Sequence, residues 1–359
     1  MVKKLCFMLL MVIMMVGCST NTQSKPTDHA QEKGTAIQTL SNRGIEVIAD
    51  NLEIPWAIEK VENLFYITER TGHIVKIQEG TMERQQVRLK QELATAAEAG
   101  LLGFVLAPDF TQSKLAYAYY TYVDGDKQFN RIVTLRQEAD VWYEEQLLLD
   151  HIVSGTFHHG GRLKIGPDGK LYATVGDAVQ ASVAQDPLAL EGKILRMNLD
   201  GSVPQDNPFP NSVVYSYGHR NPQGLAWSLD GVLFASEHGN SANDEINKIE
   251  AGQNYGWPII EGNETQRGMI SPLFTSGSNT TWAPSGMDYD DNKLYVAALR
   301  GAAILEFNLA TNKQRELLTG LGRIRDIVVD EQYLYFISNN TDGRGNPQKN
   351  DDKLYRIPL

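Results

Sequence analysis

One short pattern recurs along the chain: a turn, then a leucine followed within two residues by Tyr or Phe, then a run of alternating apolar residues. The aromatic residues of its six occurrences are Tyr66, Tyr117, Tyr172, Phe234, Tyr295 and Tyr335. Alternating runs bounded by Gly, Asp, Asn or Pro indicate strands, and helical periodicity is scarce. Strand repeats about 40 to 60 residues apart are typical of radial arrays of four-stranded sheets.

We therefore predict an all-β fold, a six-bladed β-propeller of four-stranded antiparallel sheets. A seventh match at Lys353-Leu354-Tyr355 ends the chain and is expected to pair with a strand near 45–48, which would close the ring. The alternative is an unrelated all-β protein that uses the same common turns. No linker interrupts the chain after residue 40, so 41–359 is expected to be one domain.

The N-terminus has the pattern of a secretion signal. Lys3 and Lys4 precede an uncharged, mostly apolar run over 6–16, which is short for a membrane-spanning helix. Gly17 directly before Cys18 resembles a bacterial lipobox, so we expect a signal peptide over 1–17, cleavage before Cys18 and lipidation of its thiol. The alternative is a plain signal peptide with an incidental cysteine. Residues 18–40 are polar and without periodicity, as in a flexible tether.

These features predict an extracytoplasmic protein that a lipid anchor holds at a bacterial membrane. The two cysteines both lie in the first 18 residues, so no disulfide framework is expected. The formal net charge of −11 disfavours nucleic acid as a partner, because an acidic protein repels a phosphate backbone.

Three short polar segments hold four of the seven histidines. The first, His158-His159-Gly160-Gly161, precedes a predicted strand, where an imidazole can exchange a proton near neutral pH; either histidine could instead be a hydrogen-bonded loop residue. The second contains Arg220 and Asn221, which suit either a planar anion or a structural turn.

The third segment contains Gly239, Asn240, Asp244 and Glu245. Its carboxylates and loop carbonyls are hard oxygen ligands that suit Ca²⁺, although a solvated acidic turn would look the same.

Several arginines stand out in an acidic chain. Arg300 lies at a predicted strand end, and Arg323 and Arg325 alternate so that both side chains face one way. Two such arginines repel each other unless an anion lies between them, and Asp326 is a candidate for offsetting part of the charge. The alternative is simple surface exposure.

From about residue 45 to the end, the chain resembles the soluble pyrroloquinoline quinone (PQQ)-dependent sugar dehydrogenases of the glucose/sorbosone dehydrogenase family. The resemblance rests on Gly-His-Arg-Asn-Pro-Gln-Gly-Leu at 218–225, Asp-Glu-Ile-Asn at 244–247 and Asn-Tyr-Gly-Trp-Pro at 254–258, with Glu-Ala-Gly-Leu-Leu-Gly-Phe at 98–104. It implies a six-bladed propeller with PQQ beside Ca²⁺ in the channel mouth. It also implies oxidation of an aldose at its anomeric carbon to a lactone, with an electron acceptor that the residues do not specify.

The resemblance also implies roles for individual residues. His158 would be the general base, and Arg220 would stabilise negative charge on the quinone oxygen. Gly239 and Asn240 would offer carbonyls to Ca²⁺, with Asp244 and Glu245 in the same loop. The residues placed at the cofactor are Glu98, Arg220, Asn221, Arg300, Arg323 and Arg325.

Four positions depart from the glucose enzymes of that family, and together they favour a broad aldose specificity. Phe157 stands where an acidic residue orients substrate, Ser182 where a Gln contacts the sugar, Asn240 where Pro is common and Arg300 where some members have Lys. Two other functions fit the same scaffold: a Ca²⁺-dependent lactonase or esterase, and a non-catalytic binding propeller at the cell surface.

Overall fold

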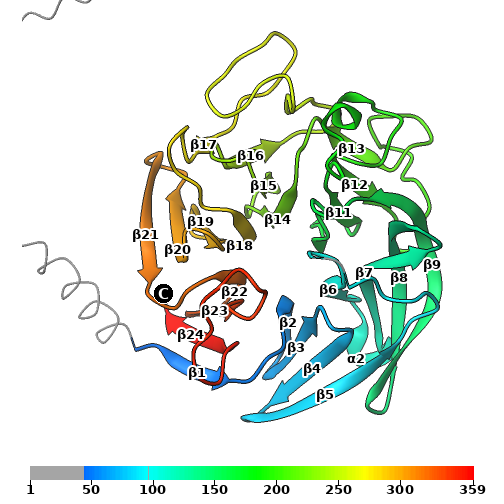
Figure 1. Cartoon of the computed structure of the whole chain (residues 1–359), viewed down its shortest axis with the longest axis vertical. Coiled ribbons are helices and arrows are strands. Elements are labelled where there is room, and N and C mark those ends of the chain that lie inside the picture. Colours follow the sequence, from blue (N-terminus) through cyan, green and yellow to red (C-terminus); the bar gives the residue numbers. More distant parts are fainter. Residues whose placement is uncertain (1–43, 96) are drawn as a thin grey trace, which may run out of the picture.

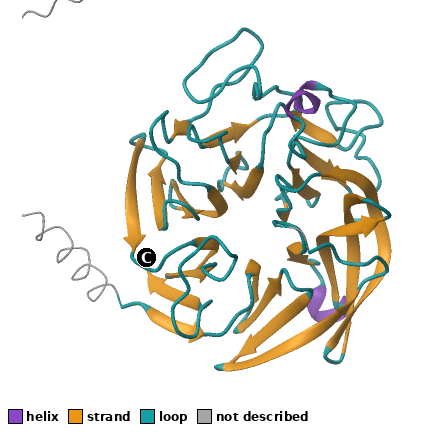
Figure 2. Ribbon diagram, in the orientation of Figure 1, coloured by secondary structure: helices purple, strands orange, loops and turns teal. Residues whose placement is uncertain are grey.

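The computed structural model describes residues 44–359 apart from residue 96. The predicted signal peptide, Cys18 and the tether over 18–40 lie outside the described residues, so these features remain predictions. The described chain is almost entirely β-structure (Figure 2), with one short α-helix, α2 (Phe110–Ser113), and one 3₁₀ helix, η1 (Ala181–Gln185).

The strands form five sheets around a ring (Figure 1). Four sheets have four antiparallel strands each. In chain order these are β10 (Leu163–Ile165), β11 (Leu171–Val175), β12 (Lys193–Met197) and β13 (Val214–Tyr217); β14 (Pro222–Trp227), β15 (Leu233–Glu237), β16 (Glu245–Ile249) and β17 (Phe274–Thr275); β18 (Pro284–Asp290), β19 (Lys293–Ala298), β20 (Ala303–Asn308) and β21 (Lys313–Thr319); and β22 (Ile324–Asp330), β23 (Tyr333–Ser338) and β24 (Leu354–Pro358) with β1 (Glu46–Ala49).

The fifth sheet has eight strands and consists of two antiparallel quartets. One quartet is β2 (Pro55–Val61), β3 (Leu64–Glu69), β4 (His73–Gln78) and β5 (Thr81–Arg88), and the other is β6 (Leu101–Leu106), β7 (Leu115–Asp124), β8 (Lys127–Glu138) and β9 (Val141–Ser154). Parallel pairing of β5 with β9 joins the two quartets at their outer strands.

The ends of the described chain pair as the sequence predicted. β1 runs antiparallel to the C-terminal strand β24, with Glu46 opposite Arg356 and Val47 opposite Tyr355. Arg356 Nη2 lies 2.7 Å from Glu46 Oε2. One sheet therefore contains both the first and the last described strand, which closes the ring (Figure 1).

The repeated aromatic residues occupy one equivalent position in the fold. Each lies on the second strand of its quartet, namely β3, β7, β11, β15, β19 or β23, and each is buried. Tyr335, for example, packs against Phe65 of the adjacent sheet, with ring centroids 5.0 Å apart. The repeat thus supplies the apolar contacts between neighbouring sheets.

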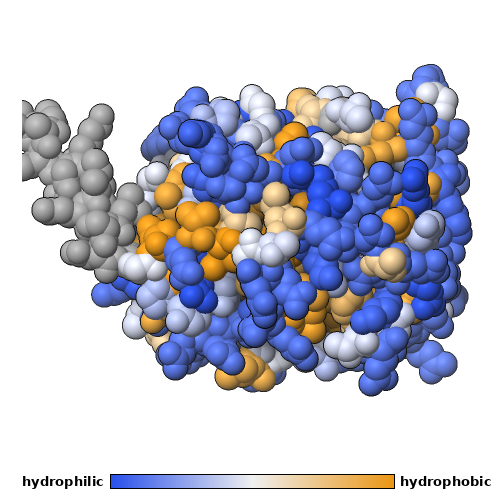
Figure 3. Space-filling view, turned by 90° about the horizontal axis from the view of Figure 1, so that it is seen from below, coloured by the Kyte–Doolittle hydropathy of each residue, from blue (hydrophilic) through white to orange (hydrophobic). Residues whose placement is uncertain are grey.

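This arrangement determines where the polar segments meet. The first strands of the quartets lie next to one another around the centre, and residues that precede several of them, such as His158 before β10 and Arg220 before β14, line one cavity. The side view in Figure 3 shows a mostly hydrophilic surface with small hydrophobic patches. No helix in the described part of the chain has the length and hydrophobicity needed to cross a membrane.

Candidate active site

A cavity of about 470 Å³ lies where these segments meet, which is within the size range of small-molecule and cofactor sites. It brings together nearly all of the site residues that the sequence singled out. Those that line it are Glu98, His158, Arg220, Asn221, Gly239, Asn240, Asp244, Arg300, Arg323 and Arg325. The exception is Glu245, which lines a separate small cavity.

His158 is held by a carboxylate that the sequence analysis did not select. Its Nδ1 lies 2.7 Å from Oδ1 of Asp177, which follows the end of β11 and is buried. Asp177 also accepts hydrogen bonds from the Val179 backbone N–H at 2.9 Å and from the indole Nε1–H of Trp257 at 2.8 Å. A carboxylate with these donors acts as an acceptor, so His158 Nδ1 carries the hydrogen and Nε2 keeps its lone pair.

The backbone around His158 is closely packed. His158 has a left-handed φ of 65°, which is strained for a residue with a side chain. A Cβ added at Gly176 would lie 2.0 Å from the His158 carbonyl oxygen, so only glycine allows the end of β11 to approach this closely. The approach places Asp177 beside the imidazole.

The second histidine of the pair, His159, has a structural role. The side chain of His159 is buried, and its Nδ1 lies 2.8 Å from the Ser154 hydroxyl. Burial lowers the pKa of His159 to about 4, although the nearby Glu98 carboxylate opposes the shift. His159 is therefore neutral at physiological pH and is the hydrogen-bonded loop residue of the pair.

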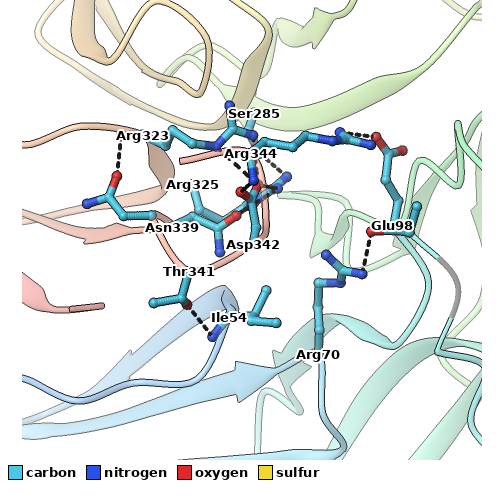
Figure 4. Close-up of polar contacts among 12 residues, drawn as sticks. Ile54, Arg70, Glu98, Ser285, Arg323, Arg325, Asn339, Thr341, Asp342 and Arg344 are labelled. Atoms are coloured by element: carbon cyan, nitrogen blue, oxygen red, sulfur yellow. Dashed lines mark hydrogen bonds and ion pairs between the residues drawn. The ribbon is translucent and has the colours of Figure 1, made fainter. Parts of the chain in front are cut away.

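Glu98 connects His158 to a loop of the last sheet. Its Oε2 accepts the backbone N–H of His158 at 3.1 Å, and its Oε1 accepts Nη1 of Arg344 at 2.6 Å. Burial by itself would raise the pKa of Glu98, but the charge and hydrogen bond of Arg344 dominate and lower it to about 2. Glu98 is therefore ionised and engaged on both oxygens, and Figure 4 shows its contact with Arg344.

Hydrogen bonds to neighbouring segments hold Arg220 and Asn221 beside the cavity. Glu237, at the end of β15, accepts the Arg220 backbone N–H and also the Nδ1–H of buried His219. The Arg220 guanidinium lies 5.3 Å from the centroid of the Trp257 ring, and its buried Nε has no hydrogen-bond partner among the described residues. Asn221 Oδ1 accepts the backbone N–H of Gly160 at 3.0 Å, which ties this segment to the histidine segment.

Arg323 and Arg325 share an anion, but it is not Asp326. Arg323 Nη2 lies 2.7 Å from Oδ2 of Asp342, and Arg325 Nη2 lies 4.0 Å from the same atom (Figure 4). Asp326 instead pairs with Arg162 at 2.7 Å. The register of β22 shifts between residues 324 and 326, so simple alternation does not describe this segment.

The two arginines differ in burial and partners. Arg325 is buried and bonds to the side-chain oxygens of Gln223, Ser285 and Asn339, and burial lowers its pKa to about 9. Arg300 is exposed in the cavity, and none of the described residues gives its guanidinium a hydrogen bond or ion pair.

The cavity carries an excess of positive charge. Six arginines line it, Arg70 and Arg344 in addition to the four that the sequence predicted, against three carboxylates, Glu98, Asp244 and Asp342. Unneutralised guanidinium groups in a partly enclosed site favour an anionic ligand, and carboxylates fit their forked geometry. The donor set therefore fits a polycarboxylate such as PQQ.

The predicted metal loop is organised by Asp244. Its Oδ2 accepts the Thr281 hydroxyl and the backbone N–H groups of Trp282 and Ala283, and its Oδ1 accepts the backbone N–H of Gly239. A carboxylate that satisfies four donors supports the loop rather than offering free oxygens.

Glu245 points away from the cavity because it is adjacent to Asp244 on an extended segment. It accepts the backbone N–H of Gly262, and burial raises its pKa to about 8, so it is largely uncharged. Across 44–95 and 97–359, no three His, Cys, Asp or Glu side chains gather as a metal site. The backbone carbonyls of Gly239 and Asn240 are oxygen donors at this loop, and the Asn240 carbonyl also accepts Arg220 Nη2 at 3.5 Å.

Two of the four positions that differ from the glucose enzymes of the family can be located relative to the cavity. Phe157 is 38% exposed beside the cavity, and the Arg344 guanidinium lies 5.4 Å from its ring centroid. Ser182 lies in η1 and does not line the cavity.

Sequence reasoning missed Arg70, Asp177, Asp342 and Arg344. Only Asp177 had a local signal, as a lone carboxylate after a Gly at the end of a predicted strand.

The fold and the cavity define a class of protein: a β-propeller with a cation-rich pocket and a carboxylate-oriented histidine. The Glucose / Sorbosone dehydrogenase family model matches residues 52–355. The chain therefore belongs to the glucose/sorbosone dehydrogenase family.

Individual relatives agree with this assignment. Quinoprotein glucose dehydrogenase B of Acinetobacter calcoaceticus is 35% identical over 70% of this chain, and the match spans 59% of that relative's length. Aldose sugar dehydrogenase YliI of Escherichia coli K12 is 30% identical over 83% of this chain and 91% of its own. The PQQ-bound aldose sugar dehydrogenase of Streptomyces coelicolor is similar in structure, with a TM-score of 0.82, 33% identity, and coverage of 88% of this chain and 98% of that one.

Proposed function

We propose that this chain is a PQQ- and Ca²⁺-dependent aldose dehydrogenase that oxidises the sugar at its anomeric carbon to the lactone. The observation that carries the proposal is the His158–Asp177 pair beside a cavity with six arginines. The pair provides a base, and the arginines provide sites for the carboxylates of PQQ. We further propose six blades, counting each antiparallel quartet as one blade.

His158 would take the proton of the anomeric hydroxyl at Nε2. Asp177 keeps the hydrogen on Nδ1 and would stabilise the imidazolium that forms. Trp257 holds Asp177 through its indole N–H and lies under the Arg220 guanidinium, so one side chain positions both groups. When bound, PQQ supplies a quinone that accepts the hydride from the anomeric carbon.

The other residues would bind and orient the cofactor. Arg300, Arg323 and Arg325 would hold its carboxylates, and the Arg220 guanidinium, which lines the cavity, would donate to one of its oxygens. Ca²⁺ would be held by the carbonyls of Gly239 and Asn240. Two carbonyls are too few ligands for Ca²⁺, which takes six to eight oxygens, so Ca²⁺ should bind tightly only together with PQQ.

We also propose that Cys18 is lipidated and anchors the enzyme at a bacterial membrane outside the cytoplasm. The support is the sequence pattern at 1–18 and the polar segment at 18–40. Electrons would then pass from the cofactor to an external acceptor. Mass spectrometry of the mature protein would show acylation of Cys18 as its first residue; an unmodified N-terminus elsewhere would contradict the anchor.

Reconstitution tests the activity. The purified chain, with PQQ and Ca²⁺, is expected to reduce a dye when an aldose is added and to lose this activity when either component is omitted. His158→Gln should abolish turnover while PQQ still binds. Failure to bind PQQ would overturn the proposal, and hydrolysis of a lactone in Ca²⁺ without PQQ would indicate the lactonase instead.

A further inference from the structure

Two arginines of the cavity, Arg70 and Arg344, have no place in the cofactor set just described. Both lie beside His158. Arg344 bonds to Glu98, which accepts the His158 backbone N–H, and Arg70 donates to the carbonyls of Ala97 and Ala99 on either side of Glu98. Figure 4 shows both guanidinium groups directed toward the Glu98 segment. The substrate must lie at this end of the cavity, because the base lies there.

This end of the cavity carries net positive charge. Four of the cavity's arginines, Arg70, Arg323, Arg325 and Arg344, lie near two carboxylates, Glu98 and Asp342. Glu98 already accepts one donor on each oxygen, which leaves it less able to accept the hydroxyls of a neutral sugar. The adjacent Phe157 offers only an apolar face.

Arg344 retains capacity for a ligand. A guanidinium has five N–H donors, and among the described residues Glu98 accepts only one of them, from Nη1 of Arg344. The side chain is 44% exposed and faces the cavity, where its position over Phe157 holds it in place. A carboxylate could therefore be bound here without displacing Glu98.

We propose that the preferred substrates are aldoses that carry a carboxylate, such as uronic acids, and that Arg344 determines this preference. This inference rests on the proposed function. The anomeric end would lie at His158 and the sugar carboxylate at Arg344. The reaction is unchanged: the anomeric C–H leaves as hydride to the bound quinone, the O–H proton goes to His158, and the lactone carbonyl forms, while the sugar carboxylate is not altered.

The test compares glucuronate with glucose in the PQQ- and Ca²⁺-loaded protein. We expect kcat/KM to favour glucuronate by about tenfold or more, because a hydrogen-bonded charge pair in a partly enclosed site supplies that much. Arg344→Gln should reduce the glucuronate-to-glucose ratio by about tenfold, and raising the salt concentration should reduce it as well. Arg267→Gln, which removes an exposed arginine outside the cavity, is the matched control and should leave the ratio unchanged.

Binding gives a readout that needs no turnover. In PQQ-loaded His158→Gln protein, calorimetry should show tighter binding of glucuronate than of glucose, and the additional Arg344→Gln change should remove the difference. Equal or better use of glucose, or a ratio that Arg344→Gln does not change, would overturn this inference but not the dehydrogenase. Absence of PQQ-dependent turnover with both sugars would overturn the proposed function and this inference with it.

Discussion

The Nδ1 atom of His158 lies 2.7 Å from the Oδ1 atom of Asp177, 19 positions later in the chain. The two residues come from separate segments, one before β10 and one after β11, and Gly176 allows them to meet. A buried carboxylate that fixes the tautomer of an imidazole is a common arrangement for a general base.

Asp177→Asn should reduce kcat by roughly a hundredfold or more, because the amide can donate to Nδ1 and favour the tautomer that leaves no lone pair at Nε2. PQQ affinity should stay near the wild-type value, since Asp177 does not line the cavity. Steady-state dye reduction and PQQ titration measure the two quantities. A kcat within threefold of wild type would show that His158 does not depend on this carboxylate.

Substitutions of Arg300 and Arg323 distinguish a residue that only binds the cofactor from one that also stabilises the fold. Arg300→Ala should weaken PQQ binding by about tenfold and leave the free energy of unfolding unchanged, because its guanidinium has no partner among the described residues. Arg323→Ala should weaken PQQ binding and also reduce stability by about 2 kcal/mol, because Asp342 is 3% exposed and would lose its closest cation.

PQQ titration and urea denaturation of the apoprotein, run on both variants, provide the measurements. Equal losses of stability in the two variants would contradict the assignment of Asp342 to Arg323. Unchanged PQQ affinity in either variant would remove that arginine from the cofactor set.

Much of the fold follows from local sequence. The aromatic repeat marks the second strand of every quartet because those side chains fill the space between sheets, and the C-terminal match with its N-terminal partner closes the ring. The polar segments gather at one end because, in an antiparallel quartet, the start of the first strand and the end of the second strand lie at the same end. These are consequences of strand periodicity and repetition, which a sequence displays directly.

The pairs of charged residues that contact each other at the site could not be predicted in the same way. Arg344 and Glu98 are 246 positions apart, and nothing in either segment points to the other. The sequence offers Asp326 to offset part of the charge of Arg323 and Arg325, but Asp326 pairs with Arg162, and the two arginines share Asp342 instead. Likewise, Asp244 and Glu245 are neighbours whose side chains leave an extended segment on opposite sides.

Asp244 is predicted to stabilise the loop that contains Gly239 and Asn240. Asp244→Asn replaces one acceptor oxygen with an NH₂ group that would face N–H donors, so it should reduce the free energy of unfolding by about 3 kcal/mol. Urea denaturation of the apoprotein measures this without cofactor. Glu316→Gln, an exposed change on β21, is the control and should alter stability by less than about 0.5 kcal/mol. A similar small effect for Asp244→Asn would show that its four contacts contribute little.

Glu59 lies outside the candidate active site, in a second cavity of about 310 Å³ that Lys164 and Asp288 also line. Burial raises the pKa of Glu59 from 4.5 to about 7, with a smaller contribution from the charge of Asp326, while Lys164 opposes the shift. The folded protein therefore keeps a proton on Glu59 over a pH range in which the unfolded chain has lost it.

The pH dependence of stability follows from this difference. Between about pH 4.5 and pH 7 the folded state binds more protons at Glu59 than the unfolded state, so the free energy of unfolding falls as the pH rises. Glu59→Gln removes this loss of stability. The free energy of unfolding of the variant minus that of wild type should therefore be larger at pH 8 than at pH 5, by up to about 3 kcal/mol. Urea denaturation at both pH values measures the change, with exposed Glu62→Gln as the control. A difference between Glu59→Gln and wild type that is the same at pH 5 and pH 8 would mean that Glu59 titrates alike in both states.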